Sequence, residues 1–399
     1  MKELKEKKGK ANLIKAGVLV GLSLLVLSPW IVWKLQPQRD LNLVIVDKTV
    51  PVRTYREHSS LVWALNHLKV KAPEQHERWQ LDTDYIGYYP PAKGGAGGVE
   101  RMLTPADLQG KDILFITDTY GVYRQDVKES ARKKAADYSP RIVGGLDSRE
   151  ADAIEAFVKG GGTLIGEFNT FATPTPKDVR ARMENLFRVH WKGWAGRYFD
   201  DLGHPTDVPA WAHRKWKAQT GQDWNFKGPG WILDHEESLK LLVLRLDKEV
   251  GRKGLRIVKT GNHPLSQGID TDIPFYFWFD VLEAMPGAQV LAEYHMDLTP
   301  EGRKQWQQAG LPATFPALTA VEYPSLRVYM AGDASDTDLI LGPGEIAGRE
   351  NFETLGNFKQ YQSDQGAFFW EVYLPLLRNV FAKVHPGAAS AVQAAKPAE

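Results

Sequence analysis

Residues 145–167, GLDSREADAIEAFVKGGGTLIGE, contain a complete helix-to-strand unit that decides the fold class. Asp147, with Glu150 three residues later, has the pattern of a capping box and predicts that a helix begins there. Three glycines at 160–162 end this helix and turn the chain directly into the apolar strand 163–166. The apolar stripe of the helix consists of Ala151, Ile154, Phe157 and Val158. The stretch therefore predicts an α/β fold.

The same alternation extends to both sides of this unit. Two upstream apolar runs, 41–46 and 112–117, have the length of buried strands, and residues 61–68 between them carry leucines at helical spacing. Strands that alternate with helices predict a parallel sheet with right-handed crossovers. Further downstream, strands are expected at residues 256–259, 290–294, 319–323 and 327–331.

Several of these segments together resemble a known superfamily. Residues 146–175, the strand end LFITDTYGVY at 114–123, TGNHPLSQGI at 260–269 and SLRVYMAGDASD at 325–336 carry the resemblance. They are similar to class I glutamine amidotransferases, most of all to the non-amidotransferase branches: the trimerisation domain of family 42 β-galactosidases and the ThuA-like proteins. The resemblance covers residues 41–190 and 255–340. It implies a flavodoxin-like parallel sheet with helices on both faces.

The chain departs from that superfamily at its nucleophile. Its 399 residues include no cysteine, which excludes disulfides, thiolate metal sites and cysteine nucleophiles. Members that hydrolyse glutamine have a cysteine at the turn after the strand that corresponds to 163–166. Here that turn holds Glu167, Phe168 and Asn169. Because a carboxylate cannot form the thioester intermediate, we expect no amidotransferase activity.

The N-terminus combines a basic tail with a long apolar run. Six lysines and two glutamates give residues 1–15 a charge of +4, which leaves −3 for the rest because the whole chain carries +1. Residues 16–33 are uncharged, and a helix of about 18 apolar residues is enough to cross a hydrocarbon core of roughly 30 Å. Trp30 and Trp33 stand where an interfacial aromatic belt is expected. The lysine-rich flank predicts a cytoplasmic N-terminus and an extracytoplasmic main domain in the cell membrane.

A cleaved signal peptide is the alternative for this segment. The run exceeds the roughly 7–15 apolar residues of such peptides and lacks a small-x-small cleavage site, so we expect an uncleaved single-pass anchor. The expected organisation is then a cytoplasmic tail 1–15, an anchor 16–33, an extracytoplasmic α/β domain 40–385 with an insertion at 188–255, and a disordered tail 386–399.

Acidic residues end the predicted strands at the edge where ligands bind in parallel sheets. In an enzyme, Asp118 and Glu167 would be a carboxylate pair for glycoside hydrolysis. In a binding protein, the same edge would be a ligand crevice without catalysis. The third interpretation is ordinary capping of strands and helices. The residues expected to contact a ligand there are Asp47, His58, Asn169 and Asp333.

The predicted insertion is rich in aromatic residues, since 191–231 contain six of the 13 tryptophans. Flat aromatic faces beside polar groups suit stacking on sugar rings, whereas the plainer interpretation is that these rings form the core of the insertion. No regular helical or strand period is visible in the segment. The residues considered for sugar binding are Trp191, Trp194, Arg197 and Tyr198.

Two classes of function remain open from the sequence. The first is a membrane-anchored module that binds or scaffolds envelope or exported polysaccharide. The second is an extracytoplasmic carbohydrate-active hydrolase that uses Asp118 and Glu167. No cofactor and no metal site are expected. The partners considered are a polysaccharide, the lipid bilayer through residues 16–33 and an envelope protein complex, whereas the acidic main domain argues against nucleic acid.

Overall fold

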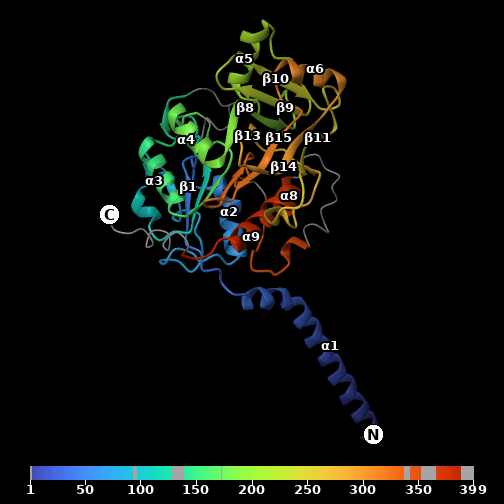
Figure 1. Ribbon diagram of the computed structural model, residues 1–399. Coiled ribbons are helices and arrows are strands. Elements are labelled where there is room, and N and C mark those ends of the chain that lie inside the picture. The colour runs from blue at the N-terminus through green and yellow to red at the C-terminus, as the bar shows by residue number, and fades with distance from the viewer. Residues whose placement is uncertain are drawn as a thin grey trace, which may run out of the picture.

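The computed structural model describes residues 2–92, 97–127, 139–171, 173–336, 342–351 and 365–387. Helix α1 (Lys2–Leu35) projects from the main domain, by which we mean the part of the chain after residue 39 (Figure 1). Within α1, the apolar segment Ile14–Leu35 has a mean hydropathy of 2.0 and is exposed except near its end, where Pro29 and Trp33 form hydrogen bonds with the main domain. This exposed apolar helix is consistent with either a membrane anchor or a signal sequence. The expected disordered tail lies outside the described residues from position 388 onward.

The main domain is built on a ten-stranded sheet in the order β12-β11-β14-β15-β16-β7-β4-β1-β2-β3. Five neighbouring strands, from β16 to β2, are parallel, and the strands beyond them run antiparallel. The strands are β1 (Leu43–Asp47), β2 (Ile86–Tyr89), β3 (Val99–Glu100), β4 (Ile113–Asp118), β7 (Thr163–Gly166), β11 (Val250–Lys259), β12 (Ile273–Pro274), β14 (Gln289–Leu298), β15 (Thr314–Val321) and β16 (Arg327–Met330).

The sheet is therefore mixed, with a parallel core, and not parallel throughout as the sequence predicted. For β15 and β16 the physical reason is the length of the connection. Only residues 322–326 separate β15 from β16, which is enough for a hairpin but too short for the crossover that two parallel strands need. The predicted strands themselves all form, and the capping box that begins α3 (Ser148–Lys159) is present, with Asp147 accepting from the Glu150 amide.

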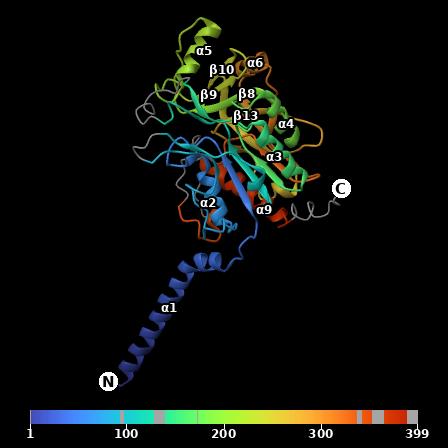
Figure 2. The same ribbon diagram turned by 90° about the vertical axis from the view of Figure 1, so that its left-hand side faces the viewer.

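The remaining helices cover the sheet or close its edges. Figures 1 and 2 both show α3 and α4 grouped together, with α2 and α9 on the other side of the parallel strands. Short helical turns lie at η1 (Arg56–His58), η2 (Pro105–Leu108) and η3 (Pro264–Ser266). The helices are α2 (Ser59–His67), α4 (Lys177–Phe187), α6 (Pro300–Gln308), α8 (Gln365–Phe368), the π-helical turn η4 (Phe369–Tyr373) and α9 (Leu374–Lys383).

A second sheet of four antiparallel strands, in the order β10-β9-β8-β13, comes largely from the predicted insertion. It contains β8 (Val189–Phe199), β9 (Gly230–His235), β10 (Leu241–Arg245) and β13 (Phe279–Ala284), with α5 (Ala210–Thr220) after β8. The sequence showed no period here because β8 contains glycines and a turn-like residue, Gly193, at φ 77°. A small hairpin of β5 (Val122–Tyr123) and β6 (Arg141–Val143) completes the described strands.

The two ends of the parallel strands have different surroundings. The linker 36–42 joins α1 to the amino end of β1, so that end faces α1. At the opposite edge the Asp280 amide of β13 donates to the Ala331 carbonyl just beyond β16. The second sheet therefore sits over the carboxyl edge, at the end of the molecule farthest from α1 (Figure 1).

Candidate functional site

The carboxyl end of β1 holds a buried acid-histidine pair. Asp47 and His58 are both fully buried, and Asp47 Oδ2 lies 2.6 Å from His58 Nδ1. On its other side, His58 Nε2 lies 2.9 Å from the Leu81 carbonyl oxygen. Because a carbonyl only accepts, Nε2 is the donor in this contact. Both residues were expected to contact a ligand, and the structure places them inside the domain with each other as partners.

Thr49 connects this pair to the end of β4. Its amide donates to Asp47 Oδ1 over 2.9 Å, and its hydroxyl donates to Asp118 Oδ1 over 2.8 Å. Burial, and then the charge of Asp47, raise the pKa of Asp118 to about 7. Asn169 donates from Nδ2 to the other Asp118 oxygen over 3.2 Å. The structure thus brings together three of the predicted site residues, Asp47, Asp118 and Asn169.

The sharp turn after β7 places Asn169, rather than Glu167, in the left-handed conformation, at φ 68°. Asparagine tolerates this region better than most residues, because its short side chain hydrogen-bonds locally. An amide is not a nucleophile. At this strained turn, where a covalent catalyst would present its reactive group, the chain therefore offers a hydrogen-bond donor to Asp118 instead.

Glu167 is fully buried and both of its carboxyl oxygens are occupied. Oε2 accepts from the Ser335 amide over 2.9 Å, and Oε1 accepts from the Ser335 hydroxyl over 2.9 Å and from the Tyr373 hydroxyl over 3.0 Å. Burial raises the pKa of Glu167 to about 8. Glu167 thus ties the end of β7 to the segment after β16 and to η4, and in this conformation it has no surface with which to contact a substrate.

Two further acids lie beside this network. Asp333 is 8% exposed, and burial followed by the charge of Asp336 raises its pKa well above the ordinary value. Asp280, which sequence reasoning missed, is fully buried, accepts from the Tyr329 hydroxyl over 2.8 Å and has a pKa raised by burial to about 7. Its signal in the sequence is a single acid inside the apolar run 275–282.

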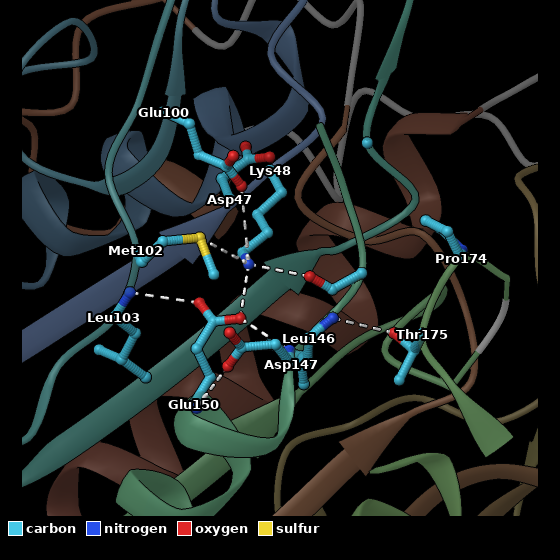
Figure 3. A network of polar contacts seen from close by, with 12 residues as sticks. Asp47, Lys48, Glu100, Met102, Leu103, Leu146, Asp147, Glu150, Pro174 and Thr175 are labelled. Atoms are coloured by element: carbon cyan, nitrogen blue, oxygen red, sulfur yellow. Dashed lines mark hydrogen bonds and ion pairs between the residues drawn. The ribbon is translucent and has the colours of Figure 1, made fainter. Parts of the chain in front are cut away.

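Lys48 is a second residue that sequence reasoning missed. The signal that could have found it is its position, because a lysine directly after a buried apolar strand is uncommon. Its Nζ is buried and lies 2.6 Å from Glu150 Oε2 and 2.8 Å from the Gly145 carbonyl oxygen (Figure 3). The other oxygen of Glu150 accepts from the Leu103 amide over 3.2 Å. Lys48 therefore fastens the end of β1 to the start of α3 and the loop before η2, which is a structural role.

The aromatic residues expected to stack on sugars lie mostly inside the domain. Trp191, Trp194 and Tyr198 are 5%, 4% and 8% exposed. Arg197 is exposed, with its guanidinium 5.1 Å from the Phe199 ring centre and 5.7 Å from that of Trp278. Their burial therefore supports the interpretation that these rings form the core of the insertion. Trp191 differs from the others because it also lines a cavity.

Trp191 lines a cavity of about 370 Å³ between α4 and the second sheet. The guanidinium of Arg180 lies 4.7 Å from its ring centre, and its indole nitrogen donates to the Trp194 carbonyl over 3.0 Å. Glu184 accepts from the Trp191 amide over 2.9 Å and lies 3.2 Å from His190 Nδ1. The wall of this cavity, named the Trp191 cavity below, also includes Lys177, Lys192, Gly193, His235 and Glu237.

The polar groups around the Trp191 cavity are of both signs. Its charged wall residues are three cations and two carboxylates. Arg180 Nε and His235 Nδ1 are buried and have no hydrogen-bond partner. Burial, and then the charges of Lys215 and Lys240, lower the pKa of His235, so its ring is neutral near pH 7. Donors and acceptors next to an aromatic floor suit a polyhydroxylated ligand better than a strongly charged one.

Among the described residues, no group of three or more histidine, aspartate or glutamate side chains is placed to hold a metal ion.

No protein-family model matches the chain, and no curated protein matches it. Its similarities are to solved structures. A β-galactosidase from Bacillus circulans sp. alkalophilus matches at 12% identity over 88% of this chain with a TM-score of 0.37, and the match spans only 32% of that longer protein. A putative ThuA-like protein from Bacteroides uniformis matches at 9% identity over 75% of this chain and 83% of its own, with a TM-score of 0.32.

A cytoplasmic protein from Salmonella typhimurium LT2 matches at 14% identity over 70% of this chain and 75% of its own, with a TM-score of 0.32. The chain is thus similar to a ThuA-like protein and to part of a β-galactosidase, the two groups that its sequence resembles, and it has no cysteine for the chemistry of the glutamine amidotransferases.

Proposed function

We propose that this chain is a single-pass membrane protein whose extracytoplasmic domain binds a saccharide in the Trp191 cavity, as part of handling an envelope or exported polysaccharide. The observation that carries the proposal is the cavity itself, whose wall sets the Trp191 ring beside cations and carboxylates. Hydroxyl groups of a sugar can pair with both kinds of group, because each hydroxyl both donates and accepts.

The membrane assignment is supported by how α1 joins the main domain. The Trp33 indole donates to the His67 carbonyl over 2.8 Å, and the Ala347 amide donates to the Pro29 carbonyl over 3.0 Å. The end of the apolar helix is therefore part of the folded structure, which favours a retained anchor over a cleaved signal sequence. The lysines of residues 1–15 favour a cytoplasmic N-terminus.

Catalysis has weaker support than binding. A hydrolase with Asp118 and Glu167 as its acid and base requires both carboxyls to reach the substrate. Glu167 is fully buried, and its oxygens are taken up by Ser335 and Tyr373. The raised pKa values of Asp118 and Glu167 follow from burial, which also occurs at structural sites.

The test is a binding assay of the full chain in detergent against a panel of purified polysaccharides and their oligosaccharides. We expect saturable binding to a member of the panel without release of reducing sugar. Trp191→Phe reduces the aromatic surface of the cavity and His235→Ala removes a polar group from it. We expect each to weaken binding at least about tenfold, because part of the aromatic contact or one to two hydrogen bonds are lost. Thermal unfolding establishes that both variants fold.

The matched control is Trp211→Phe, a change at a half-buried tryptophan of α5 that packs in a separate aromatic cluster. This control is expected to bind like the parent. If nothing in the panel binds, or if the three variants bind alike, the cavity is not the site. Turnover that disappears in Glu167→Gln would replace the binding proposal by the hydrolase.

Orientation has its own test. In cell fractions the chain should stay with the membranes after alkaline extraction, and its intact mass should include residues 1–33. Protease added to the outside of cells with an intact cell membrane should digest the main domain. A soluble product lacking those residues would contradict the anchor and leave the saccharide assay unaffected.

A further inference from the structure

A cavity of about 440 Å³ lies where α1 joins the main domain. Its wall includes linker residues 36–39, His67 at the end of α2, and Arg378 of α9. The linker follows the apolar segment Ile14–Leu35 directly. Given the proposed anchor, this cavity, named the linker cavity below, lies at the depth of the lipid headgroups.

Arg39 is held firmly in the wall of the linker cavity by its backbone. Its amide donates to the Lys69 carbonyl over 2.8 Å, its carbonyl accepts from the Lys71 amide over 2.9 Å, and it forms a parallel bridge with Val70. The side chain is half-buried, and within the described part of the chain its guanidinium has no hydrogen bond or ion pair. A fixed backbone with an unpaired fork of donors is a preorganised site for an anion.

The charges around Arg39 leave it uncompensated. The one carboxylate in the wall, Glu350, already forms an ion pair with Arg378 and lies 3.6 Å from His67 Nε2. Burial opposes ionisation of Glu350, yet hydrogen bonding to His67 and contact with Arg378 lower its pKa to about 2. Burial, and then the charge of Arg378, lower the pKa of Arg39. The wall thus holds two arginines and one carboxylate, and that carboxylate is paired with Arg378.

The surroundings indicate which anion would reach this place. Lys34 lies 5.0 Å from the Trp30 ring centre, and Lys69 lies 5.0 Å from that of Trp33. Pairs of this kind are typical of the boundary between hydrocarbon and headgroups. The lipid phosphate is the anionic group that lies at this boundary in both leaflets, and it matches the fork of a guanidinium in a bidentate contact.

We infer that the linker cavity binds the phosphate of an anionic lipid headgroup, with Arg39 as its main ligand and Arg378 beside it. The inference rests on the proposed membrane anchor. It assigns the junction a second purpose: a bound lipid would add contacts that hold the main domain in one orientation on the membrane.

The experiment uses the full chain in micelles of a neutral detergent, titrated with phosphatidylglycerol or with zwitterionic phosphatidylcholine, and native mass spectrometry measures the bound lipid. We expect tighter binding of phosphatidylglycerol. Arg39→Gln should weaken it about tenfold, since a charge-assisted bidentate contact is lost. Arg39→Lys keeps the positive charge but loses the forked guanidinium, so its affinity for phosphatidylglycerol should lie between those of the parent and Arg39→Gln.

The control is Lys71→Gln, which removes a positive charge close by that is paired with Asp40 outside the cavity wall. Equal losses in Arg39→Gln and Lys71→Gln would overturn the inference in favour of diffuse attraction to charged lipid. Inorganic phosphate at millimolar concentration is the alternative ligand. If it displaces phosphatidylglycerol and its own binding requires Arg39, the site binds free phosphate and the lipid assignment is overturned. A membrane-retained chain that fails the lipid test refutes this inference alone, whereas loss of residues 1–33 refutes the anchor.

Discussion

At the scale of single residues, the carboxyl edge of the sheet is governed by buried acids that are paired with neutral donors. Glu167 accepts from two hydroxyls and one amide, and Asp280 accepts from a tyrosine. Hydrogen bonds from neutral donors compensate only part of the cost of removing a charge from water, so the folded state holds these protons more tightly than the unfolded chain.

This makes stability depend on pH. Because the pKa of Glu167 is raised from 4.5 to about 8, the folded state binds more protons between these values. The contribution of Glu167 to the free energy of unfolding should therefore be largest below about pH 4.5 and fall as pH rises to about 8, by about 1.4 kcal/mol per unit. In Glu167→Gln the slope should be smaller by that amount, while Asp118 and Asp280 keep the remainder.

Chemical denaturation of both proteins at pH 5, 6, 7 and 8 measures the two slopes. Parallel curves would mean that Glu167 does not titrate in this window.

Lys48 provides the contrasting case of a buried charge paired with another charge. Lys48→Met leaves Glu150 buried without its partner, and we expect a loss of about 3–5 kcal/mol in the free energy of unfolding. The double change Lys48→Met/Glu150→Gln should recover part of it. Arg149→Met breaks an ion pair whose arginine is 89% exposed and should cost less than about 1 kcal/mol. Urea unfolding compares the three, and equal losses would show that burial is not the cause.

At the scale of elements, the site depends on how closely β2 approaches β1. Gly87 in β2 has φ 151°, and a Cβ added there would lie 1.6 Å from the Asp47 carbonyl oxygen. No other residue type fits in that space, so the pairing of β1 with β2 requires glycine at this position.

Gly87→Ala should therefore destabilise the protein by at least about 3 kcal/mol and disturb the Asp47–His58 pair, because the strands must separate. The matched control is Gly110→Ala, at φ 68° with no atom within 4 Å of the added Cβ, where only backbone strain of about 1–2 kcal/mol is expected. Thermal unfolding measures both. A cost at Gly87 no larger than at Gly110 would show that β2 can shift freely.

At the scale of the whole molecule, the proposed binding site and the proposed membrane anchor lie at opposite ends of the parallel strands. The second sheet covers the carboxyl edge, and α1 is attached at the amino edge through Trp33 and Ala347 (Figure 1). In a membrane-anchored protein this places the Trp191 cavity away from the bilayer, where an extended polymer has access.

The rigidity of this arrangement is testable at the junction. Trp33→Phe removes the hydrogen bond to the His67 carbonyl and keeps the ring, so trypsin should cut the linker 36–42 on the order of fivefold faster, equivalent to about 1 kcal/mol. Trp30→Phe, at a residue 48% exposed, is the control and should leave the rate unchanged. Equal rates in the parent and Trp33→Phe would indicate that the junction is held by other contacts.

Local sequence was sufficient for the parts of this protein that depend on neighbours in the chain. The capping box at Asp147, the glycine stop after α3, the buried parallel strands and the exposed apolar helix each follow from residues within one element, and the structure has all of them. The missing cysteine is a statement of composition alone and needed no structure.

Tertiary structure decided everything that joins distant segments. The sheet is mixed because β11, β12, β14 and β15 pair antiparallel to their neighbours, and β8 pairs with β13 across some 80 residues. Burial separated Glu167 from solvent, enclosed Trp194 and Tyr198, and paired Lys48 with Glu150. A residue type indicates what chemistry is available, but access, partners and charge state depend on which segments pack around it, and that is set by long-range contacts that no local pattern contains.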